Sequence, residues 1–245
     1  MQPESTIFYD VDTQRDFLLP GGALYVAGTD RIIPALAALT TMARDNHIRI
    51  VCSVDRHFPD DPELKRNGGK YDDHCMDGSQ GQKKIAETEP LDPLYIPNHP
   101  LNPREIETAL SHQGEIVFEK QEFDVFIGNR HARAILRMML EPFRDVVIYG
   151  VYTEVCVAHA VEGLTQLGPK LTIVSDAIAD IGDDADAIRN KWKHAGIVFA
   201  TVGLILGFML VRQRPVNYIT EDADGGASIV DPSVWQDTPR SRRRK

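Results

Sequence analysis

The side chain best placed for chemistry in this sequence is the thiol of Cys156. An apolar run at residues 146–151 predicts a buried strand, and the spaced apolar residues at 157–167 predict a helix that Gly168 and Pro169 would end. Cys156 then falls in the first turn of that helix, where unpaired N–H groups and the helix dipole favour a thiolate and could hold an oxyanion. A lone cysteine is as often a small buried apolar residue, so position alone leaves both interpretations open.

Other polar side chains stand where predicted strands end. Because the carboxyl ends of parallel strands meet at one edge, and ligands bind there, these ends are considered together. Each residue singly is more often a turn former, a helix cap or a solvated charge. Together they favour a site containing a carboxylate, a carboxylate with an imidazole, an ammonium and a thiol. In chain order they are Asp12, Asp55 with His57, Lys120, and Cys156.

Asp55 and His57 also have the spacing of half a metal site. Residues two apart in an extended segment point to the same side, so their side chains could converge on one ion. His74 is a third candidate ligand, and Glu63 lies between and could supply a fourth. Mixed nitrogen and oxygen ligands suit Zn, Mn or Fe(II) better than Mg or Ca. The alternative is a chance pairing of a surface His with an Asp, which the pattern around His57 alone would not exclude.

The elements that must position these residues alternate between strands and helices. Apolar Val/Ile-rich runs separated by amphipathic segments indicate a parallel sheet that is covered on both faces, so the predicted class is α/β. The stretch 58–103 breaks the pattern, and a loop of that length is usually functional. We predict strands at 6–11, 49–54, 116–119, 146–151, 171–175 and 197–202, and helices at 30–43, 129–140, 157–167 and 183–193.

Composition narrows the classes of partner. The chain of 245 residues is 42% hydrophobic, which is enough for one substantial core. A net charge of −9 and a pI near 5.4 argue against nucleic acid or an anionic membrane as the main partner. Three cysteines form no disulfide framework, and the amino terminus shows no signal peptide, so we expect a cytoplasmic protein.

The carboxy-terminal part differs from the rest. The longest apolar stretch, 197–211, is short for a membrane span and is interrupted by glycines, so we predict a strand followed by a short packed helix. The chain ends in the basic cluster 240–245, which we expect to be a solvated, disordered tail.

Five of these segments occur in the order and spacing of a known family. Together they resemble the isochorismatase-like cysteine hydrolases, and within them the nicotinamidase branch, over residues 8–202. The resemblance implies a three-layer α/β/α sandwich with a mostly parallel central sheet. We assign 1–211 to this domain and 212–245 to a carboxy-terminal extension. The segments are Asp12-Thr13-Gln14-Arg15-Asp16-Phe17, Asp55-Arg56-His57, His74-Cys75-Met76-Asp77-Gly78-Ser79, Lys120, and Gly150-Val151-Tyr152-Thr153-Glu154-Val155-Cys156-Val157.

The resemblance also implies roles for individual residues. Asp12, Lys120 and Cys156 match the catalytic triad, and Asp55, His57 and His74 match the metal ligands. Glu63 falls where some members carry a fourth ligand, and Phe17 and Tyr71 match aromatic residues that flank the substrate ring. A cis peptide is expected between Val151 and Tyr152, and the N–H groups of Tyr152 and Cys156 would form the oxyanion hole. The expected cofactor is one divalent transition metal, zinc first, with Mn or Fe as alternatives.

The implied activity is hydrolysis of nicotinamide to nicotinate and ammonia through a Cys156 thioester. Because true isochorismatases lack the cysteine, Cys156 argues against hydrolysis of a vinyl ether. Carbamoyl-type amidases of the superfamily usually lack the complete metal set. Two alternatives stay open: an amidase acting on another small or heteroaromatic amide, and a non-catalytic member that oligomerises or senses a ligand. The partners expected are a small amide substrate and further copies of the chain, as a homo-oligomer.

Overall fold

Seven parallel strands form the central sheet of the first of two units into which the chain divides, Met1–Val202 and Gly203–Lys245. The computed structural model describes residues 2–213, 218–221 and 227–230. The strand order is β3-β4-β2-β1-β5-β6-β7. The strands are β1 (Thr6–Val11), β2 (Arg49–Asp55), β3 (Leu94–Ile96), β4 (Ile116–Lys120), β5 (Asp145–Val151), β6 (Lys170–Ala179) and β7 (Val198–Ala200).

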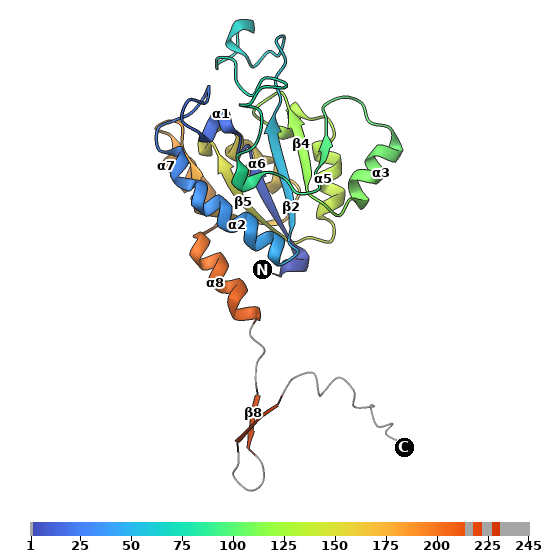
Figure 1. The fold of residues 1–245 in the computed structure, drawn as a ribbon, viewed down its shortest axis with the longest axis vertical. Coiled ribbons are helices and arrows are strands. Elements are labelled where there is room, and N and C mark those ends of the chain that lie inside the picture. The colour runs from blue at the N-terminus through green and yellow to red at the C-terminus, as the bar shows by residue number, and fades with distance from the viewer. Residues whose placement is uncertain (1, 214–217, 222–226, 231–245) are drawn as a thin grey trace. The chain divides into compact units, whose positions relative to one another are not determined.

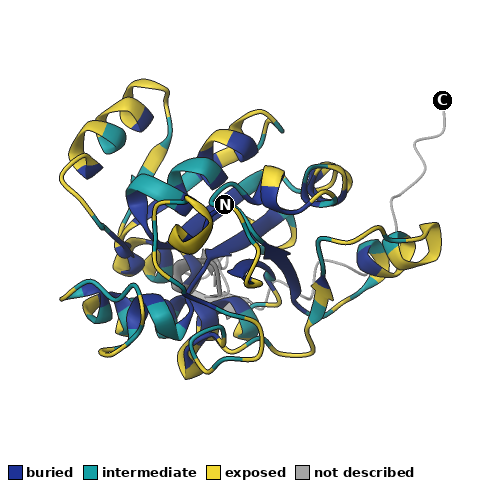
Figure 2. Ribbon diagram, turned by 90° about the horizontal axis from the view of Figure 1, so that it is seen from above, coloured by how far each residue is buried: buried dark blue, intermediate teal, exposed yellow. Residues whose placement is uncertain are grey.

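Both faces of the sheet are buried, which explains the continuous apolar runs in the sequence. Along β1, Ile7, Tyr9 and Val11 belong to one core cluster, while Phe8 lies on the opposite face and meets the ring of Tyr149 edge-on, with centroids 6.0 Å apart. Figure 2, seen from above, shows these buried strands at the centre and helices with exposed outer faces around them.

Helices cover the two faces unequally. The core cluster that contains Ile7 also takes side chains from α3 (Pro103–Ser111), α5 (Ala132–Leu140), α6 (Ala158–Thr165) and α7 (Ala185–His194). On the other face α2 (Ile33–Asp45) buries residues such as Leu36 and Leu39 and contacts β2 and β6 (Figure 1). Two single-turn helices, α1 (Arg15–Leu18) and α4 (Val125–Gly128), follow β1 and β4. The predicted α/β/α sandwich with a parallel sheet is confirmed.

Most predicted strands and helices are present, with shifted ends. The strand predicted at 6–11 matches β1, whereas β6 runs four residues past the predicted end at Ser175, and β7 covers only three residues of 197–202. The helix predicted at 30–43 begins as a 3-10 turn, Thr29–Ile32, before α2. The helix predicted from 157 begins as a π-helical turn, Thr153–Val157, so Cys156 lies in that turn and not in an α-helical one.

The stretch predicted to lack pattern, 58–103, contains β3 and leads into α3, and the sequence analysis missed both. Its largest part, coloured cyan to teal in Figure 1, lies above the carboxyl ends of the strands. The start of α3 did have a sequence signal: Asn102 accepts from the backbone N–H groups of Arg104 and Glu105, and the Glu105 carboxylate accepts from the Asn102 N–H at 2.7 Å. Pro103 occupies the first helical position, where a missing N–H costs nothing.

The second unit contains α8 (Val202–Gln213), whose first residue belongs to the sheet unit, and an antiparallel pair, β8 (Tyr218–Glu221) with β9 (Ala227–Val230). Among the described residues, no helix combines the length and apolarity needed to cross a membrane. The structure divides the chain after Val202, and the predicted boundary at residue 211 stays a prediction. The basic tail 240–245 lies outside the described residues.

Candidate active site

The order of the strands decides which side chains meet at the carboxyl edge of the sheet. Neighbouring strands β4, β2, β1 and β5 end in, or are followed by, Lys120, Asp55, Asp12 and the turn that carries Cys156. Asp55 and Lys120 are partners in the β2–β4 register. The predicted residues, which are far apart in the sequence, therefore lie on four adjacent positions of one edge.

Asp12, Lys120 and Cys156 form a buried cluster. The Lys120 Nζ lies 3.0 Å from Asp12 Oδ2 and 3.6 Å from Cys156 Sγ. An Asp12 oxygen and the Cys156 sulfur lie within 4.8 Å of each other. Lys120 also forms an ion pair with Asp55, so one ammonium is shared by two carboxylates. This arrangement places a base and a cation beside the thiol.

Asp12 is fixed through both its backbone and its carboxylate. Its residue adopts a left-handed backbone conformation, with φ of 49°, directly after β1. Ser53 Oγ donates a hydrogen bond of 2.7 Å to Asp12 Oδ1, and the Asp12 N–H donates to the Ser53 carbonyl at 3.1 Å. The sequence analysis missed Ser53, whose only signal is that it lies near the end of the strand that carries Asp55.

Burial and neighbouring charges act in opposite directions on the Cys156 thiol. Burial raises the pKa of Cys156 well above its usual value, and Asp12 raises it further, while the Lys120 ammonium only partly opposes this. Burial also raises the pKa of Asp12, against the lowering effect of Lys120. Burial therefore opposes the thiolate that a helix terminus favours, and the nearby Asp12 carboxylate is placed to take the thiol proton.

The side chain of Tyr152 connects the turn that carries Cys156 with the segment that follows β1. The peptide bond between Val151 and Tyr152 is cis, as the family resemblance implied. The Tyr152 hydroxyl lies 2.9 Å from the Phe17 carbonyl and 2.6 Å from the Leu24 carbonyl, so it can donate to either. These contacts fix the segment after β1 against the turn after β5.

The four predicted metal ligands also converge, and all are buried. His57 Nε2 lies 3.5 Å from Glu63 Oε1 and 4.0 Å from Asp55 Oδ2. His74 Nε2 lies 3.5 Å from the same Glu63 oxygen and 3.7 Å from the same Asp55 oxygen. Ligands about 2.0–2.2 Å from a tetrahedral zinc ion are separated by roughly 3.3–3.6 Å, so these spacings are close to those of a metal site.

Hydrogen bonding supports the fit of a cation at this cluster. His57 Nε2 and both Glu63 carboxylate oxygens are buried and have no hydrogen-bond partner in the described part of the chain. The opposite imidazole nitrogens are held: His57 Nδ1 lies 3.0 Å from Asp61 Oδ2, and His74 Nδ1 lies 2.8 Å from the Asp72 carbonyl. Such contacts orient the two Nε2 atoms toward the shared centre. The residues present therefore fit a divalent transition metal.

The carboxylates and imidazoles of the ligand cluster shift one another's pKa values. Burial disfavours the charged form of His74, but the nearby carboxylates of Asp55 and Glu63 outweigh it and raise the pKa of His74 to about 10. The pKa of His57 is raised in the same way, against burial, mainly by Glu63. Burial works against ionisation of Asp55, yet Lys120 and the two imidazoles lower the pKa of Asp55 overall. A bound cation would replace those protons.

The side chain of Gln14 connects Asp55 with the loop that carries His74, and the sequence analysis gave it no role. Its side-chain amide donates to the Asp55 carbonyl at 2.7 Å and accepts from the Asp55 N–H at 2.6 Å. The same amide donates to the Gln82 carbonyl at 2.6 Å, on the loop that carries His74. The sequence signal for Gln14 was its place two residues after Asp12, inside the segment 12–17 that already resembles the family.

A narrow cavity opens between the two clusters. Its volume is about 20 Å³, room for about one water molecule. Phe17 and Tyr71, the aromatic residues expected to flank a substrate ring, line it, and so does Phe123, whose ring meets Tyr71 edge-on with centroids 5.6 Å apart. Sequence reasoning missed Phe123, although it lies three residues after Lys120. The other apolar walls that it missed are Leu24, Val155 and Ile181.

Comparison with known proteins places this geometry in a family. The isochorismatase domain model matches residues 7–202, which is most of the chain. No curated protein matches the chain in sequence.

Solved structures give the same fold. Pyrazinamidase of Pyrococcus horikoshii in complex with zinc is 24% identical, with a TM-score of 0.63, and the match covers 80% of this chain and 99% of that one. Nicotinamidase from Bacillus subtilis is 20% identical, with a TM-score of 0.62 and coverage of 80% and 99%. N-carbamoylsarcosine amidase from Thermoplasma acidophilum is 22% identical, with a TM-score of 0.60 and coverage of 82% and 97%. At these identities the likeness establishes the fold. With the family match, the chain belongs to the isochorismatase domain family.

Proposed function

We propose that this member of the family is a metal-containing cysteine amidohydrolase whose substrate is nicotinamide. The observation that carries the proposal is that one apolar cavity is bordered both by the Cys156 thiol, with its base and cation, and by a cluster of ligands with unpartnered buried atoms. Solved proteins of this fold include a nicotinamidase and a pyrazinamidase in complex with zinc, which supports an aromatic amide as the substrate.

The chemistry would begin at Asp12. Its carboxylate takes the Cys156 proton, and because burial raises the pKa of Asp12, it is a stronger base than an exposed aspartate. The sulfur then attacks the amide carbonyl carbon, and the N–H groups of Tyr152 and Cys156 stabilise the oxyanion. Asp12 returns the proton to the departing ammonia, which leaves a thioester. A water molecule, deprotonated by Asp12, attacks the thioester, releases the carboxylic acid and restores the thiol.

Lys120 would keep this cycle electrically balanced. Its ammonium lies beside both Asp12 and the sulfur, so it stabilises whichever of the two carries the negative charge. The cation also remains paired with Asp55 throughout. Its proposed role is electrostatic, with no proton transfer of its own.

The ligand cluster would orient the substrate. Asp55, His57, His74 and Glu63 would hold the ion, with zinc the first choice and Mn or Fe as alternatives. When bound, the ion would supply a Lewis acid for the ring nitrogen of the substrate. Phe17, Tyr71 and Phe123 offer aromatic faces and edges to a flat ring. Because the cavity is narrow, walls such as the half-buried Phe123 must move aside for the ring to enter.

Release of ammonia from nicotinamide by the zinc-loaded protein tests the proposal. We expect turnover in the wild type, its loss in Cys156→Ala, and a reduced rate in His57→Ala. A Cys156→Ala variant that retains near wild-type turnover would overturn the mechanism. No turnover of nicotinamide, with metal bound and Cys156 open to alkylation, would move the search to other neutral amides, with pyrazinamide first. No turnover with an inert Cys156 would favour a non-catalytic member of the family.

A further inference from the structure

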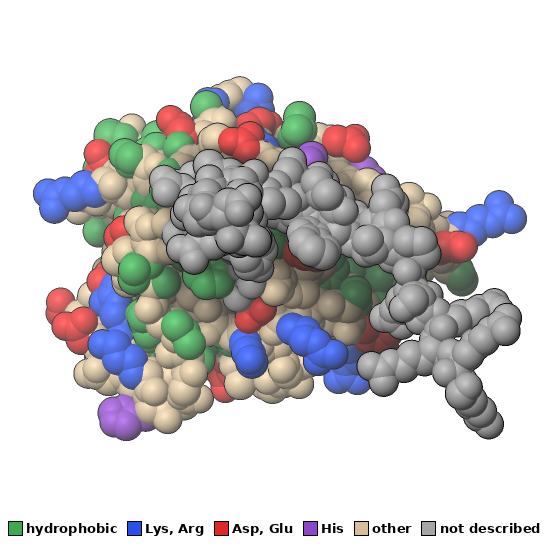
Figure 3. Space-filling view, turned by 90° about the horizontal axis from the view of Figure 1, so that it is seen from below, with side chains coloured by type: hydrophobic (Ala, Val, Ile, Leu, Met, Phe, Trp, Pro, Cys, Tyr) green, Lys and Arg blue, Asp and Glu red, His purple; other side chains and the backbone are tan. Residues whose placement is uncertain are grey.

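Asp16, in the short helix α1, uses its carboxylate differently from the acidic residues of the molecular surface. Figure 3 views the molecule from below, where acidic side chains stand beside basic ones on the visible surface. Asp16 is half-buried, and both of its oxygens bind the backbone: Oδ2 accepts from the N–H of Cys75 at 2.7 Å, and Oδ1 accepts from the N–H of Ala23 at 3.1 Å. One carboxylate therefore connects two loops that are distant in the sequence.

The backbone around Asp16 pairs with the loop that carries His74. Gln14 forms an antiparallel bridge with Lys84, and the Asp16 N–H donates to the Gly81 carbonyl at 3.2 Å. The carboxylate packs closely against the same loop, because a Cβ added at Gly81 would lie 2.1 Å from the atoms of the Asp16 carboxylate. The position of this carboxylate therefore depends on a glycine at position 81.

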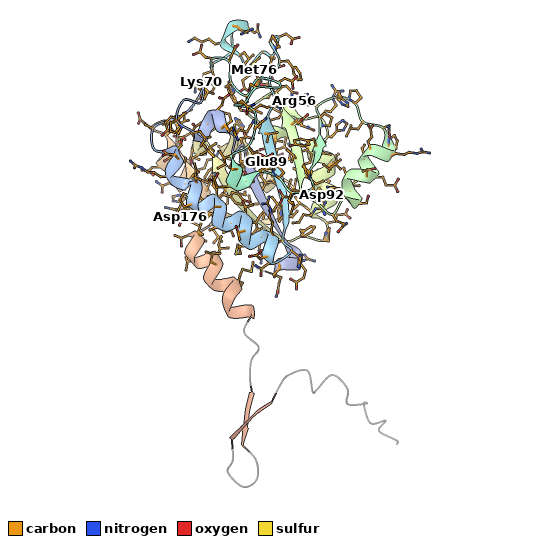
Figure 4. All side chains as sticks on the ribbon, viewed as in Figure 1. Arg56, Lys70, Met76, Glu89, Asp92 and Asp176 are labelled. Atoms are coloured by element: carbon orange, nitrogen blue, oxygen red, sulfur yellow. The ribbon has the colours of Figure 1, made fainter. Side chains whose placement is uncertain are left out.

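Cys75 connects Asp16 with both imidazole ligands. It directly follows His74 in the chain, and its carbonyl accepts from the His57 N–H at 3.0 Å. Its backbone is left-handed, with φ of 44°, which is uncommon for residues other than glycine. The hydrogen bond from the Cys75 N–H to the Asp16 carboxylate is charge-assisted and stabilises that conformation. Met76, the next residue, is labelled near the carboxyl edge of the sheet in Figure 4.

The backbone of Asp16 also holds a wall of the narrow cavity. Its carbonyl accepts from the Leu24 N–H at 3.0 Å, and Leu24 lines the cavity. The Leu24 carbonyl in turn lies 2.6 Å from the Tyr152 hydroxyl, which can donate to it. Asp16 is therefore bonded on one side to the ligand loop and on the other side to the apolar wall.

We propose that Asp16 is a positioning residue, which fixes the two imidazole ligands relative to each other and to the cavity wall through the backbone of Cys75. The inference rests on the proposed function, in which His57 and His74 hold the metal. An amide in place of the carboxylate would break the arrangement, because its oxygen accepts from one N–H while its NH2 group faces the other N–H. Loss of a contact that supports a metal ligand typically weakens metal binding about 10–100-fold.

Competition for zinc between the full-length protein and a chromogenic chelator tests the proposal. We expect zinc to bind about 10–100-fold more weakly to Asp16→Asn than to the wild type. The control is Asp176→Asn, because an Asp176 oxygen also accepts from a backbone N–H, that of Val202 at 2.8 Å. Asp176 is labelled well below Met76 in Figure 4, so its substitution should leave the affinity for zinc unchanged.

A second variant displaces the carboxylate and keeps its charge. The added methyl group of Gly81→Ala would push the Asp16 carboxylate away from the loop, so this variant should also weaken zinc binding. Gly182→Ala is its control, because the added Cβ would meet only the Glu154 carboxylate, at an ordinary 3.7 Å, and zinc affinity should stay at the wild-type value. Should Asp16→Asn fail to fold, Gly81→Ala provides the test.

Hydrogen exchange gives a readout that does not depend on metal. In the metal-free protein the backbone amide of Cys75 should exchange faster in Asp16→Asn than in the wild type or Asp176→Asn, as mass spectrometry of the peptide that contains it would show. Unchanged exchange would overturn the proposal.

The zinc measurements can overturn the role of Asp16 independently of the substrate. Equal affinities in the wild type and Asp16→Asn, equal losses in Asp16→Asn and Asp176→Asn, or a wild type that binds no zinc would each do so. Turnover is measured separately. A wild type that binds zinc but releases no ammonia from nicotinamide would refute the proposed substrate, while the comparison of zinc affinities would still decide the role of Asp16.

Discussion

The two halves of the candidate site differ in what completes them. The cluster of Asp12, Lys120 and Cys156 is complete within the protein, because Lys120 is paired with a carboxylate and Ser53 holds the other oxygen of Asp12. The ligand cluster is incomplete, since both buried oxygens of the Glu63 carboxylate lack a hydrogen-bond partner among the described residues. Metal dependence should therefore lie in one half of the site, while the geometry of the nucleophile persists without metal.

The origins of the residues differ as well. Strand ends supply Asp12, Lys120 and Asp55, so the sheet itself fixes their spacing. Glu63 and His74 come from the long segment between β2 and β3, whose position depends on contacts such as those of Gln14. The cluster built on strand ends and the cluster that depends on a loop should therefore respond differently to substitutions and to removal of the metal.

The largest expected effect comes from removing the lysine shared by both halves. Lys120→Met would leave Asp12 buried without its cation and would remove one of the partners of Asp55, and breaking a buried pair costs about 3–5 kcal/mol of unfolding free energy. Urea denaturation measures that loss, and turnover should vanish with it. The other buried lysine offers a control: Lys84 lies 3.0 Å from Asp10 Oδ1, outside the proposed chemistry.

Lys84→Met should therefore destabilise the protein by a similar amount but keep turnover per folded molecule. If Lys120→Met were as active as Lys84→Met, the assignment of Lys120 to the catalytic half would be wrong.

Removal of the metal separates the two halves directly. Chelation should abolish turnover of nicotinamide and lower the stability, by about 4 kcal/mol if zinc had been present at a thousand times its Kd. The alkylation rate of Cys156 by iodoacetamide, followed by mass spectrometry, should change by less than about threefold, because its base and cation stay in place. A collapse of Cys156 reactivity on chelation would show that the halves are not independent.

A variant of Gln14 tests whether its bonds between Asp55 and the loop that carries His74 support the ligand cluster. Gln14→Met removes both hydrogen bonds to the Asp55 backbone and the bond to the loop, so we expect zinc to bind about 10–100-fold more weakly, as is typical when a supporting contact of a metal ligand is lost. Competition with a chromogenic chelator measures this. Gln121 is a matched control, since its amide donates to the Arg56 carbonyl at 2.9 Å and to neither half. Equal losses in Gln14→Met and Gln121→Met would contradict the connection.

The smallest expected effect is a pH dependence of the stability that arises in the ligand cluster alone. In the metal-free protein the carboxylates of Asp55 and Glu63 raise the pKa of His74 to about 10, above the ordinary value of 6.5. The stabilisation from protonated His74 is therefore complete below about pH 6.5 and is lost as the pH rises toward about 10.

Thermal unfolding of the metal-free protein across this range should show Tm falling with pH, and His74→Asn should lack that part of the fall. Zinc binding displaces the proton, so its affinity should rise with pH over the same interval. A metal-free wild type whose pH profile equals that of His74→Asn would refute the assignment.

Part of this molecule could be predicted from single residues and their spacing. The strand at 6–11 was placed correctly because five of its six residues are β-branched or aromatic, with only Asp10 as an exception, and polar residues bound the run. The strand ends then indicated Asp12, Asp55 and Lys120, since a parallel sheet brings its carboxyl ends together. The short β3 was missed, because a strand of three residues, Leu94–Ile96, has too little pattern to be distinguished from a loop.

The sequence by itself determined the class of fold, the family and the types of residue available for chemistry, because these depend on local patterns and on motifs read along the chain. Tertiary structure alone decided the strand order, which makes Lys120 the partner of Asp55 in register. It also decided the burial of Cys156, which raises the pKa of the thiol against the effect of its position near a helix terminus. Burial and pairing depend on neighbours that are distant in sequence, and no local pattern encodes them.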